Sequence, residues 1–287
     1  TGPFIEGGLE KGFLKAPNRE RLKFALMWAN HDWIDIFPAS LGKKPELLHP
    51  GAVTRETFDA ATDHIIKTYF TQPNYWRIDG KAYFSVYELM TLVQGLGGVE
   101  ATRAALDDFR RRAAAAGVGP IHLNAVVWGI QVLPTEKTIK NPEEMLAALG
   151  FDSVTSYCWI HHVLPEGFPT VDYNTWKELS VAKWPEFVKR WAVPYYPNVS
   201  MGWDPSPRTN QRDEFKNAGY PFTPVFTGNT PEAFKDALLQ ARNFLEKQPA
   251  DRRILTINAW NEWTEGSYLE PDTRHGMAYL DAIREIF

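Results

Sequence analysis

Apolar residues follow two alternating patterns along this chain. Short runs rich in β-branched and aromatic residues, typical of strands, are separated by longer segments with apolar positions at helical spacing. The alternation predicts an α/β protein. Strands are expected at residues 22–28, 82–87, 122–128, 153–157, 193–201 and 254–259, and helices at residues 55–69, 99–116, 143–149, 175–191, 231–246 and 277–286.

Several predicted helices have recognisable ends. Thr54 and Thr230 precede acidic first turns, and Asn141 precedes Pro142 and two glutamates, so all three are expected to cap helix N-termini. Gly117 is expected to end a helix. These signals support the helix positions that the apolar spacing predicts.

Regular strand–helix alternation predicts a parallel sheet covered by helices. No glycine-rich phosphate loop follows any predicted strand, and residues 95–98 form a turn after a short helical run at 89–94. This disfavours a dinucleotide-binding fold and favours a (β/α)8 barrel of the TIM type, in which the chemistry lies at the C-terminal strand ends.

The number of strands is two short of such a barrel. Six strand–helix units fill all 287 residues, and the segment 4–14 before the first strand has a helical pattern. We therefore expect one catalytic domain over residues 1–287, of (β/α)8 TIM-barrel type, with its first two strands missing. Truncation or processing would explain their loss, or another chain would supply them.

Polar and aromatic residues gather where the predicted strands end, as in the wall of a carbohydrate cleft. Each also has a structural interpretation: Asp32 can cap a helix, Glu88 can pair with a lysine, and Asp204 can initiate a turn. The candidate substrate-binding residues are Trp28, Asn30, His31, Asp32, Tyr87, Glu88, Asn124, Trp128, Tyr157, Trp159, Trp203, Asp204, Arg208, Asn261 and Trp263.

The last predicted strand is followed by two carboxylates between tryptophans. Glu262 and Glu265 follow Trp260 and flank Trp263. An apolar ring beside a carboxyl group can raise its pKa, and one protonated with one ionised carboxyl group can cleave a glycosidic bond. On a straight strand the two would point to opposite faces, so the backbone must turn, which Gly266 permits. The alternative is a solvated loop with scattered acids.

Composition excludes some classes of partner. The net charge is -4 with no long basic run, which disfavours nucleic acid and anionic membranes, and no apolar stretch approaches the ~20 residues of a membrane span. Aromatic residues make up 14% of the chain. They fit either a large aromatic core or a cleft for flat, polyhydroxylated ligands.

Metal and nucleophile chemistry have little support in the sequence. Cys158 is the only cysteine and is expected to be a packing residue. His161 and His162 are adjacent and lack a third ligand at a recognisable spacing, so no metal site and no cofactor are expected. No nucleophile elbow of the serine hydrolase type is present.

The segment from Asn261 to Gly266, with Leu269-Glu270-Pro271, resembles the last-strand signature of the glycoside hydrolase family 99-like domain. That group includes WbsX-type proteins labelled glycosyltransferases. Weaker similarities occur in the same order at residues 24–32, 78–81, 157–159 and 203–208, so the resemblance spans most of the chain.

The resemblance implies a (β/α)8-barrel enzyme that retains anomeric configuration, as in endo-α-mannosidases and endo-α-mannanases. Glu262 would take the proton of the sugar 2-hydroxyl, whose oxygen closes on the anomeric carbon to form a 1,2-anhydro sugar. Glu265 would protonate the leaving oxygen and later activate water. Thr264 stands where the mannosidase branch usually has histidine, which puts mannose specificity in question. The resemblance also favours a periplasmic or extracellular location.

The sequence thus predicts a retaining glycoside hydrolase, endo-acting in the family's manner, with a polysaccharide or oligosaccharide as its partner. A glycosyltransferase of surface-polysaccharide assembly is one alternative, although neither a phosphate-binding loop nor a metal-binding Asp-x-Asp is evident. A non-catalytic carbohydrate-binding protein is another.

Overall fold

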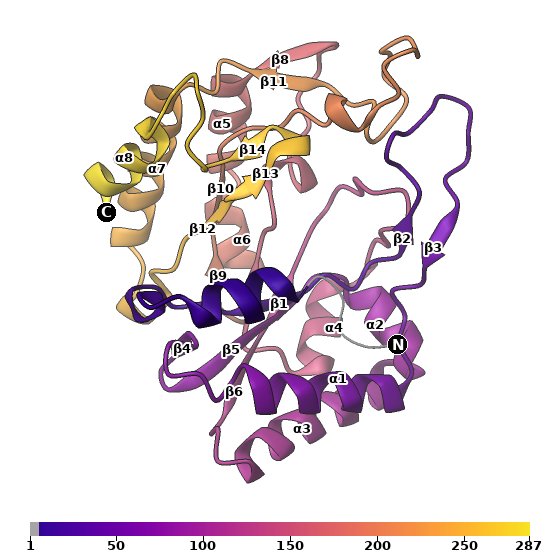
Figure 1. Ribbon diagram of the computed structural model, residues 1–287, viewed down its shortest axis with the longest axis vertical. Coiled ribbons are helices and arrows are strands. Elements are labelled where there is room, and N and C mark those ends of the chain that lie inside the picture. The colour runs from indigo at the N-terminus through magenta and orange to yellow at the C-terminus, as the bar shows by residue number, and fades with distance from the viewer. Residues whose placement is uncertain (1–5) are drawn as a thin grey trace.

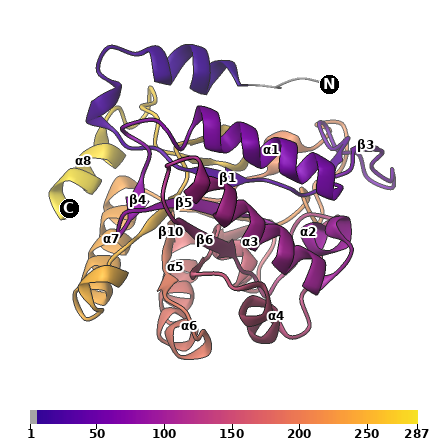
Figure 2. The same cartoon turned by 90° about the horizontal axis from the view of Figure 1, so that it is seen from below.

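The computed structural model describes residues 6–287 and contains a curved parallel sheet at its centre (Figures 1 and 2). Its first five strands pair in chain order, each parallel to the next, and its last two form a separate parallel pair. The strands are β1 (Leu26–Trp28), β5 (Lys81–Val86), β6 (Ile121–Val126), β7 (Ser153–Thr155), β9 (Tyr195–Tyr196), β10 (Asn198–Ser200) and β12 (Thr256–Asn258).

The helices form an arc around these strands (Figure 2). Within residues 6–287, no helix combines the length and apolarity needed to cross a membrane. The helices are α1 (Arg55–Thr68), α2 (Leu89–Leu96), α3 (Val99–Ala115), α4 (Pro142–Leu149), α5 (Tyr173–Val181), α6 (Trp184–Arg190), α7 (Pro231–Glu246) and α8 (Ala278–Ile286).

The six predicted strands are all present, and the predicted barrel-type α/β fold is confirmed. The fifth predicted strand is divided at Pro197 into β9, which pairs with β7, and β10, which pairs with β12. Among residues 6–287, β1 pairs only with β5 and β12 only with β10, apart from isolated bridges outside the strands. The described barrel is therefore open between β1 and β12.

Three details of the predicted helices differ from the structure. The helix expected at 175–191 is two helices, α5 and α6, because Pro185 lacks the N–H that a continuous helix needs and instead occupies the first turn of α6. Asn141 makes no capping hydrogen bond with its side chain, which instead bonds to Glu144. Of the segment 4–14, residues 4 and 5 lie outside the described residues, and the rest forms a π-helix at Gly7–Gly12 and part of a 3-10 helix at Phe13–Lys15.

The other predicted caps are confirmed. The Thr54 hydroxyl accepts a 3.2 Å hydrogen bond from the Thr57 N–H at the start of α1. The Thr230 hydroxyl does the same for the Ala233 N–H of α7 at 3.3 Å. Such caps satisfy backbone donors that the first turn of a helix leaves free.

Several short strands beside the parallel strands of the barrel were not predicted. Strands of two or three residues carry too little alternation to be recognised from a sequence. They are β2 (Trp33–Ile34) with β3 (Leu47–His49), β4 (Arg77–Ile78) with β5, β8 (Thr170–Asp172) with β11 (Val225–Thr227), and β13 (Asn261–Glu262) with β14 (Ser267–Tyr268).

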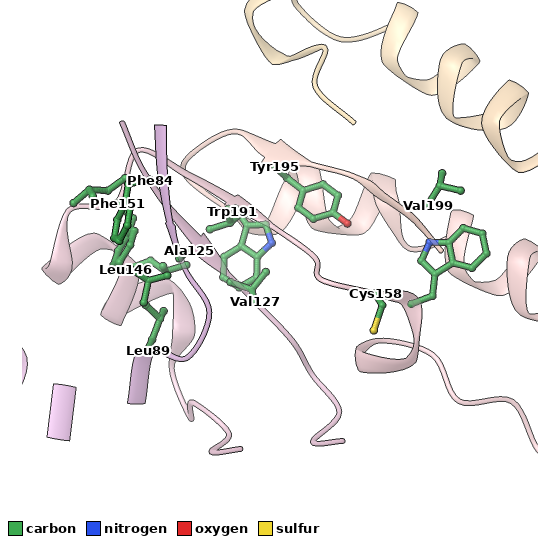
Figure 3. Close-up of a cluster of buried hydrophobic side chains, with 14 of the residues drawn as sticks. Phe84, Leu89, Ala125, Val127, Leu146, Phe151, Cys158, Trp191, Tyr195 and Val199 are labelled. Carbon is green, nitrogen blue, oxygen red and sulfur yellow. The ribbon is translucent and has the colours of Figure 1, made fainter. Parts of the chain in front are cut away.

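Aromatic packing fixes the helices to the sheet. Phe109 of α3 is fully buried, and its ring lies 5.5 Å from that of Phe84 on β5 and 5.9 Å from that of Phe70. Figure 3 shows Phe84 beside Leu146 of α4 and Phe151. Because the strands that these contacts support run parallel, the loops at their C-terminal ends lie on one side of the barrel.

Candidate active site

A cavity of ≈ 330 Å³ lies at the C-terminal ends of the parallel strands. The loops after β1, β5, β6, β7, β10 and β12 contribute its polar residues. Leu48 of the β2–β3 hairpin and Val132 with Leu133 add an apolar wall. The cavity brings together eight of the candidate residues from the sequence: His31, Asp32, Tyr87, Tyr157, Trp203, Arg208, Glu262 and Glu265.

The backbone turns sharply between the two glutamates, as their spacing required. Glu262 ends β13, a 3-10 helix spans Trp263–Glu265, and Gly266 follows with a φ of 62° in the left-handed region that glycine tolerates. Both carboxyl groups consequently line one cavity. Glu265 is buried, whereas the Glu262 side chain keeps about a third of its surface exposed.

Arg208 holds the two glutamates together. Its Nη2 donates a 2.6 Å hydrogen bond to Glu262 Oε1, and its Nη1 lies 3.0 Å from Glu265 Oε1. Nε donates to the Thr264 hydroxyl at 2.9 Å, and this hydroxyl lies 3.3 Å from Glu262 Oε1. One guanidinium thus contacts three polar side chains of the turn, Glu262, Thr264 and Glu265, because its donors form a planar fork.

Tyr220 is a fourth residue in contact with Arg208, and the sequence did not indicate it. Its hydroxyl donates a 2.7 Å hydrogen bond to Glu265 Oε1 and accepts one from Arg208. Tyr220 lies on the loop before β11, away from any strand end, so no pattern marked it. Burial raises the pKa of its hydroxyl, and the neighbouring Glu265 raises it further.

Burial and neighbouring charges shift the pKa values of Glu265 and Arg208. Burial raises the pKa of Glu265 above its ordinary value, and the charge of Glu262 adds to the rise, while Arg208 and the Tyr220 hydrogen bond act in the opposite direction. Burial alone would lower the pKa of Arg208, but Glu265, Tyr220 and Glu262 hold it above its ordinary value. The arrangement therefore combines a buried, more basic carboxyl group with a partly exposed one beside a fixed cation.

A buried network supports the opposite wall of the cavity. Glu136 accepts hydrogen bonds from the Tyr87 hydroxyl at 2.6 Å and from the backbone N–H groups of Val132 and Leu133, and its Oε1 lies 3.1 Å from His161 Nε2. The sequence pointed to His161 only as a weak metal ligand and did not mark Glu136. Burial would raise the pKa of Glu136, but His161 and the other donors lower it below its ordinary value.

Three candidate residues lie close to this cavity without lining it. Trp128 packs against Tyr87, with ring centroids 5.1 Å apart. Asp204 and Trp263 line a second, neighbouring cavity, which Trp203 shares with the first.

The remaining candidate residues have structural contacts. The Glu88 carboxylate caps α2, and the Asn30 amide bonds to the backbone of Glu88 at 2.7 and 2.8 Å. Burial raises the pKa of Glu88 to about 7. These two residues fix the β1 and β5 strand ends to each other and to α2.

Four other candidates do not line either cavity. Trp28 stacks on Phe58 at 5.9 Å, Asn124 is buried with hydrogen bonds to Ser85 and Ser153, Trp159 donates its indole N–H to the Asn198 carbonyl, and Asn261 pairs with Tyr268 between β13 and β14.

Residues 6–287 contain no group of three or more His, Cys, Asp or Glu side chains arranged to hold a metal ion. The Cys158 thiol is buried and lies 3.2 Å from His161 Nδ1. Burial lowers the pKa of His162 to about 3.

Fold and site together define an open (β/α)-barrel protein with two carboxyl groups in one cavity at the C-terminal strand ends. A family model described as "Glycosyltransferase WbsX" matches residues 9–283, so the chain belongs to the WbsX family. It is also similar to an uncharacterized protein, WxcX, from two strains of Xanthomonas campestris pv. campestris, with 27% identity over 265 residues. The match covers 92% of this chain and 34% of the relative, so the chain spans about a third of the length of these curated relatives.

Solved structures with this fold include a glycoside hydrolase-like protein. The similarity has a TM-score of 0.55 at 16% identity and covers 81% of this chain and 61% of that one. The endo-α-mannosidase of family 99 from Bacteroides thetaiotaomicron is similar with a TM-score of 0.47 at 14% identity, over 81% of this chain and 60% of that one.

Proposed function

We propose that the protein is a retaining glycoside hydrolase acting on a polysaccharide or oligosaccharide, with Glu262 and Glu265 as its catalytic residues. The observation that carries this proposal is the pair of carboxyl groups that line one cavity and share the Arg208 guanidinium. The aromatic rings of Tyr87, Tyr157 and Trp203 offer apolar surface for a sugar beside these polar groups.

In the proposed reaction Glu262 is the base. Its partly exposed carboxylate takes the proton of the sugar 2-hydroxyl, and that oxygen forms a bond to the anomeric carbon as the glycosidic bond breaks. Glu265 donates its proton to the departing oxygen, a role that suits a carboxyl group whose pKa burial raises.

The second half of the reaction reverses these proton transfers. Glu265, now ionised, takes a proton from water, whose oxygen attacks the anomeric carbon and opens the 1,2-anhydro ring. Glu262 returns its proton to the 2-oxygen. Two displacements at the anomeric carbon restore its original configuration, so retention is expected.

A substitution of Glu265 tests the assignment. We expect Glu265→Gln to lower glycan cleavage by several orders of magnitude, because the amide cannot donate a proton to the leaving oxygen. Glu246→Gln is the matched control, since Glu246 is an exposed residue of α7 that pairs with Arg242 and lines neither cavity. Cleavage by Glu265→Gln as fast as by the parent would overturn the proposal.

A glycosyltransferase is the second candidate, because the family model carries that description. It would use the same cavity to transfer a sugar from an activated donor. Titration with nucleotide sugars separates the two, since tight binding of one of them would favour transfer. Glycan binding that survives loss of both glutamates, with no product, would instead indicate a non-catalytic carbohydrate-binding protein.

A further inference from the structure

A second cavity of ≈ 620 Å³ lies next to the candidate active site and exceeds it in volume. Its walls come from the loop after β10, from β11, from the turn after β12 and from the loop before α8. Nothing in the proposed hydrolysis uses this space, although its chemistry resembles that of a ligand site.

Only a thin wall separates the two cavities. Trp203 lines both, and the Asp204 N–H donates a 2.5 Å hydrogen bond to the Glu265 carbonyl. A Cβ atom on Gly266 would lie 2.7 Å from Asp204 Cβ, so the segments approach closely because residue 266 has no side chain. The same turn directs Glu262 and Glu265 into the first cavity and Trp263 into the second.

Trp263 provides a flat, ordered surface in the second cavity. Its ring stacks on Tyr268 with centroids 3.7 Å apart and planes 14° apart, and its indole N–H donates a 2.6 Å hydrogen bond to Glu270. Despite these contacts Trp263 is 44% exposed. A fixed aromatic face that remains accessible can stack on the apolar face of a sugar ring at little entropic cost.

Polar groups of both signs surround this aromatic face. The Arg274 guanidinium makes no ion pair within the described part of the chain, while its backbone N–H and that of His275 bond to Asp272 Oδ1, which holds the loop. Asp204 lines the same cavity. A guanidinium and a carboxylate together can donate to and accept from sugar hydroxyls, and the Asp204 charge would oppose a carboxylate-bearing sugar.

We propose that this cavity is a second saccharide subsite, which holds a neutral sugar unit of the same glycan whose cleavage point occupies the first cavity. The inference rests on the proposed function, because it places a glycan in the first cavity. It explains why the turn between the glutamates presents an ordered tryptophan to the side away from the carboxyl groups.

The test measures binding without turnover. The protein is labelled with 5-fluorotryptophan and carries Glu265→Gln, and the Trp263 resonance is identified by its loss in Trp263→Phe. The probes are neutral hexasaccharides of mannose, rhamnose, glucose or galactose, with hexagalacturonate as the acidic comparison. We expect at least one neutral probe to shift the Trp263 resonance saturably, and hexagalacturonate to bind more weakly.

Arg274→Gln should raise the Kd of that probe about tenfold, because it removes a charged hydrogen-bond donor. Arg284→Gln removes the same charge from an exposed residue of α8 that pairs with Asp281, and should leave the Kd unchanged. A Trp263 resonance that no probe moves, or equal Kd values for the two arginine variants, would overturn the subsite. If the parent cleaves the glycan but no probe shifts the Trp263 resonance, the subsite proposal is wrong and the hydrolase proposal stands. If a probe shifts the Trp263 resonance but the parent cleaves no glycan, the hydrolase proposal is wrong and the binding site stands.

Discussion

The Tyr220 hydroxyl donates a 2.7 Å hydrogen bond to the Glu265 carboxylate across 45 residues of sequence. This bond favours the ionised form of Glu265, whereas burial favours the protonated form. The pKa of Glu265 therefore reflects opposing effects, and the Tyr220 hydrogen bond is one that can be removed without changing the carboxyl group.

Tyr220→Phe removes that hydrogen bond and should raise the pKa of Glu265 further. If Glu265 is the general acid, the alkaline limb of the kcat/KM profile should move to higher pH by roughly one unit. The control is Tyr173→Phe, which removes a buried hydroxyl that donates to the Ser200 carbonyl, remote from the glutamates. An alkaline limb at the same pH in Tyr220→Phe and the parent would argue against Glu265 as the acid.

Arg208→Gln should impair both glutamates at once. Without the guanidinium the pKa of Glu265 rises, and Glu262 loses the donor that orients it, so we expect kcat/KM to fall on the order of 10²-fold. Arg103→Gln, which breaks an exposed pair with Asp107, should leave kcat/KM unchanged. Full activity in Arg208→Gln would show that the shared cation is dispensable.

Glu88 gives a stability prediction with a defined sign. Its pKa is raised to about 7 in the folded protein, so its favourable contribution is complete below the ordinary value of 4.5 and is lost as pH rises through about 7. The glutamine of Glu88→Gln is neutral at every pH. The unfolding free energy of this variant should therefore increase, relative to that of the parent, by roughly 2–3 kcal/mol as the pH rises from below 4.5 to above 7. Urea unfolding at several pH values measures it.

The comparison variant is Glu100→Gln, an exposed residue in the first turn of α3. Its stability relative to the parent should change little with pH. If the difference in unfolding free energy between Glu88→Gln and the parent also stayed constant with pH, burial would not be the cause of a raised Glu88 pKa.

The contribution of Glu136 to stability should have the opposite pH dependence from that of Glu88. Its pKa is lowered, so its contribution is present above the ordinary glutamate value and is lost as pH falls. Glu136→Gln should cost about 2 kcal/mol near pH 7 and less near pH 3, as measured by urea unfolding. Glu144→Gln, on the exposed surface of α4, should cost under about 0.5 kcal/mol at both pH values. A Glu136→Gln cost that did not decrease toward low pH would be inconsistent with the buried network.

The sequence predicts the parts of this molecule that local patterns determine. Strand and helix periodicities locate all six strands of the barrel, and Thr54 and Thr230 mark two helix starts because capping involves residues three apart. The turn after Trp263 follows from the glutamate spacing and Gly266. Each of these features depends on neighbours along the chain.

Contacts between distant segments are what the sequence does not reveal. Tyr220 and Glu136 reach the site from loops whose paths depend on tertiary packing, and neither lies directly at the end of a predicted strand. A position near a strand end also does not determine whether a side chain faces the cavity. Trp159 is buried in the core, whereas Tyr157, two residues earlier, lines the cavity. Within such short segments, the side-chain direction is set by packing and cannot be read from residue type.

Reaction in H₂¹⁸O distinguishes hydrolysis with retention in this cavity from transfer of an activated sugar. The protein is incubated with a neutral glycan panel and no nucleotide sugar, and products are followed by NMR and mass spectrometry. If the protein is a retaining hydrolase, we expect one ¹⁸O atom at each new reducing end and the substrate's anomeric configuration in the product first formed. Product formation only when a nucleotide sugar is added, with no ¹⁸O at the anomeric carbon, would contradict this proposal.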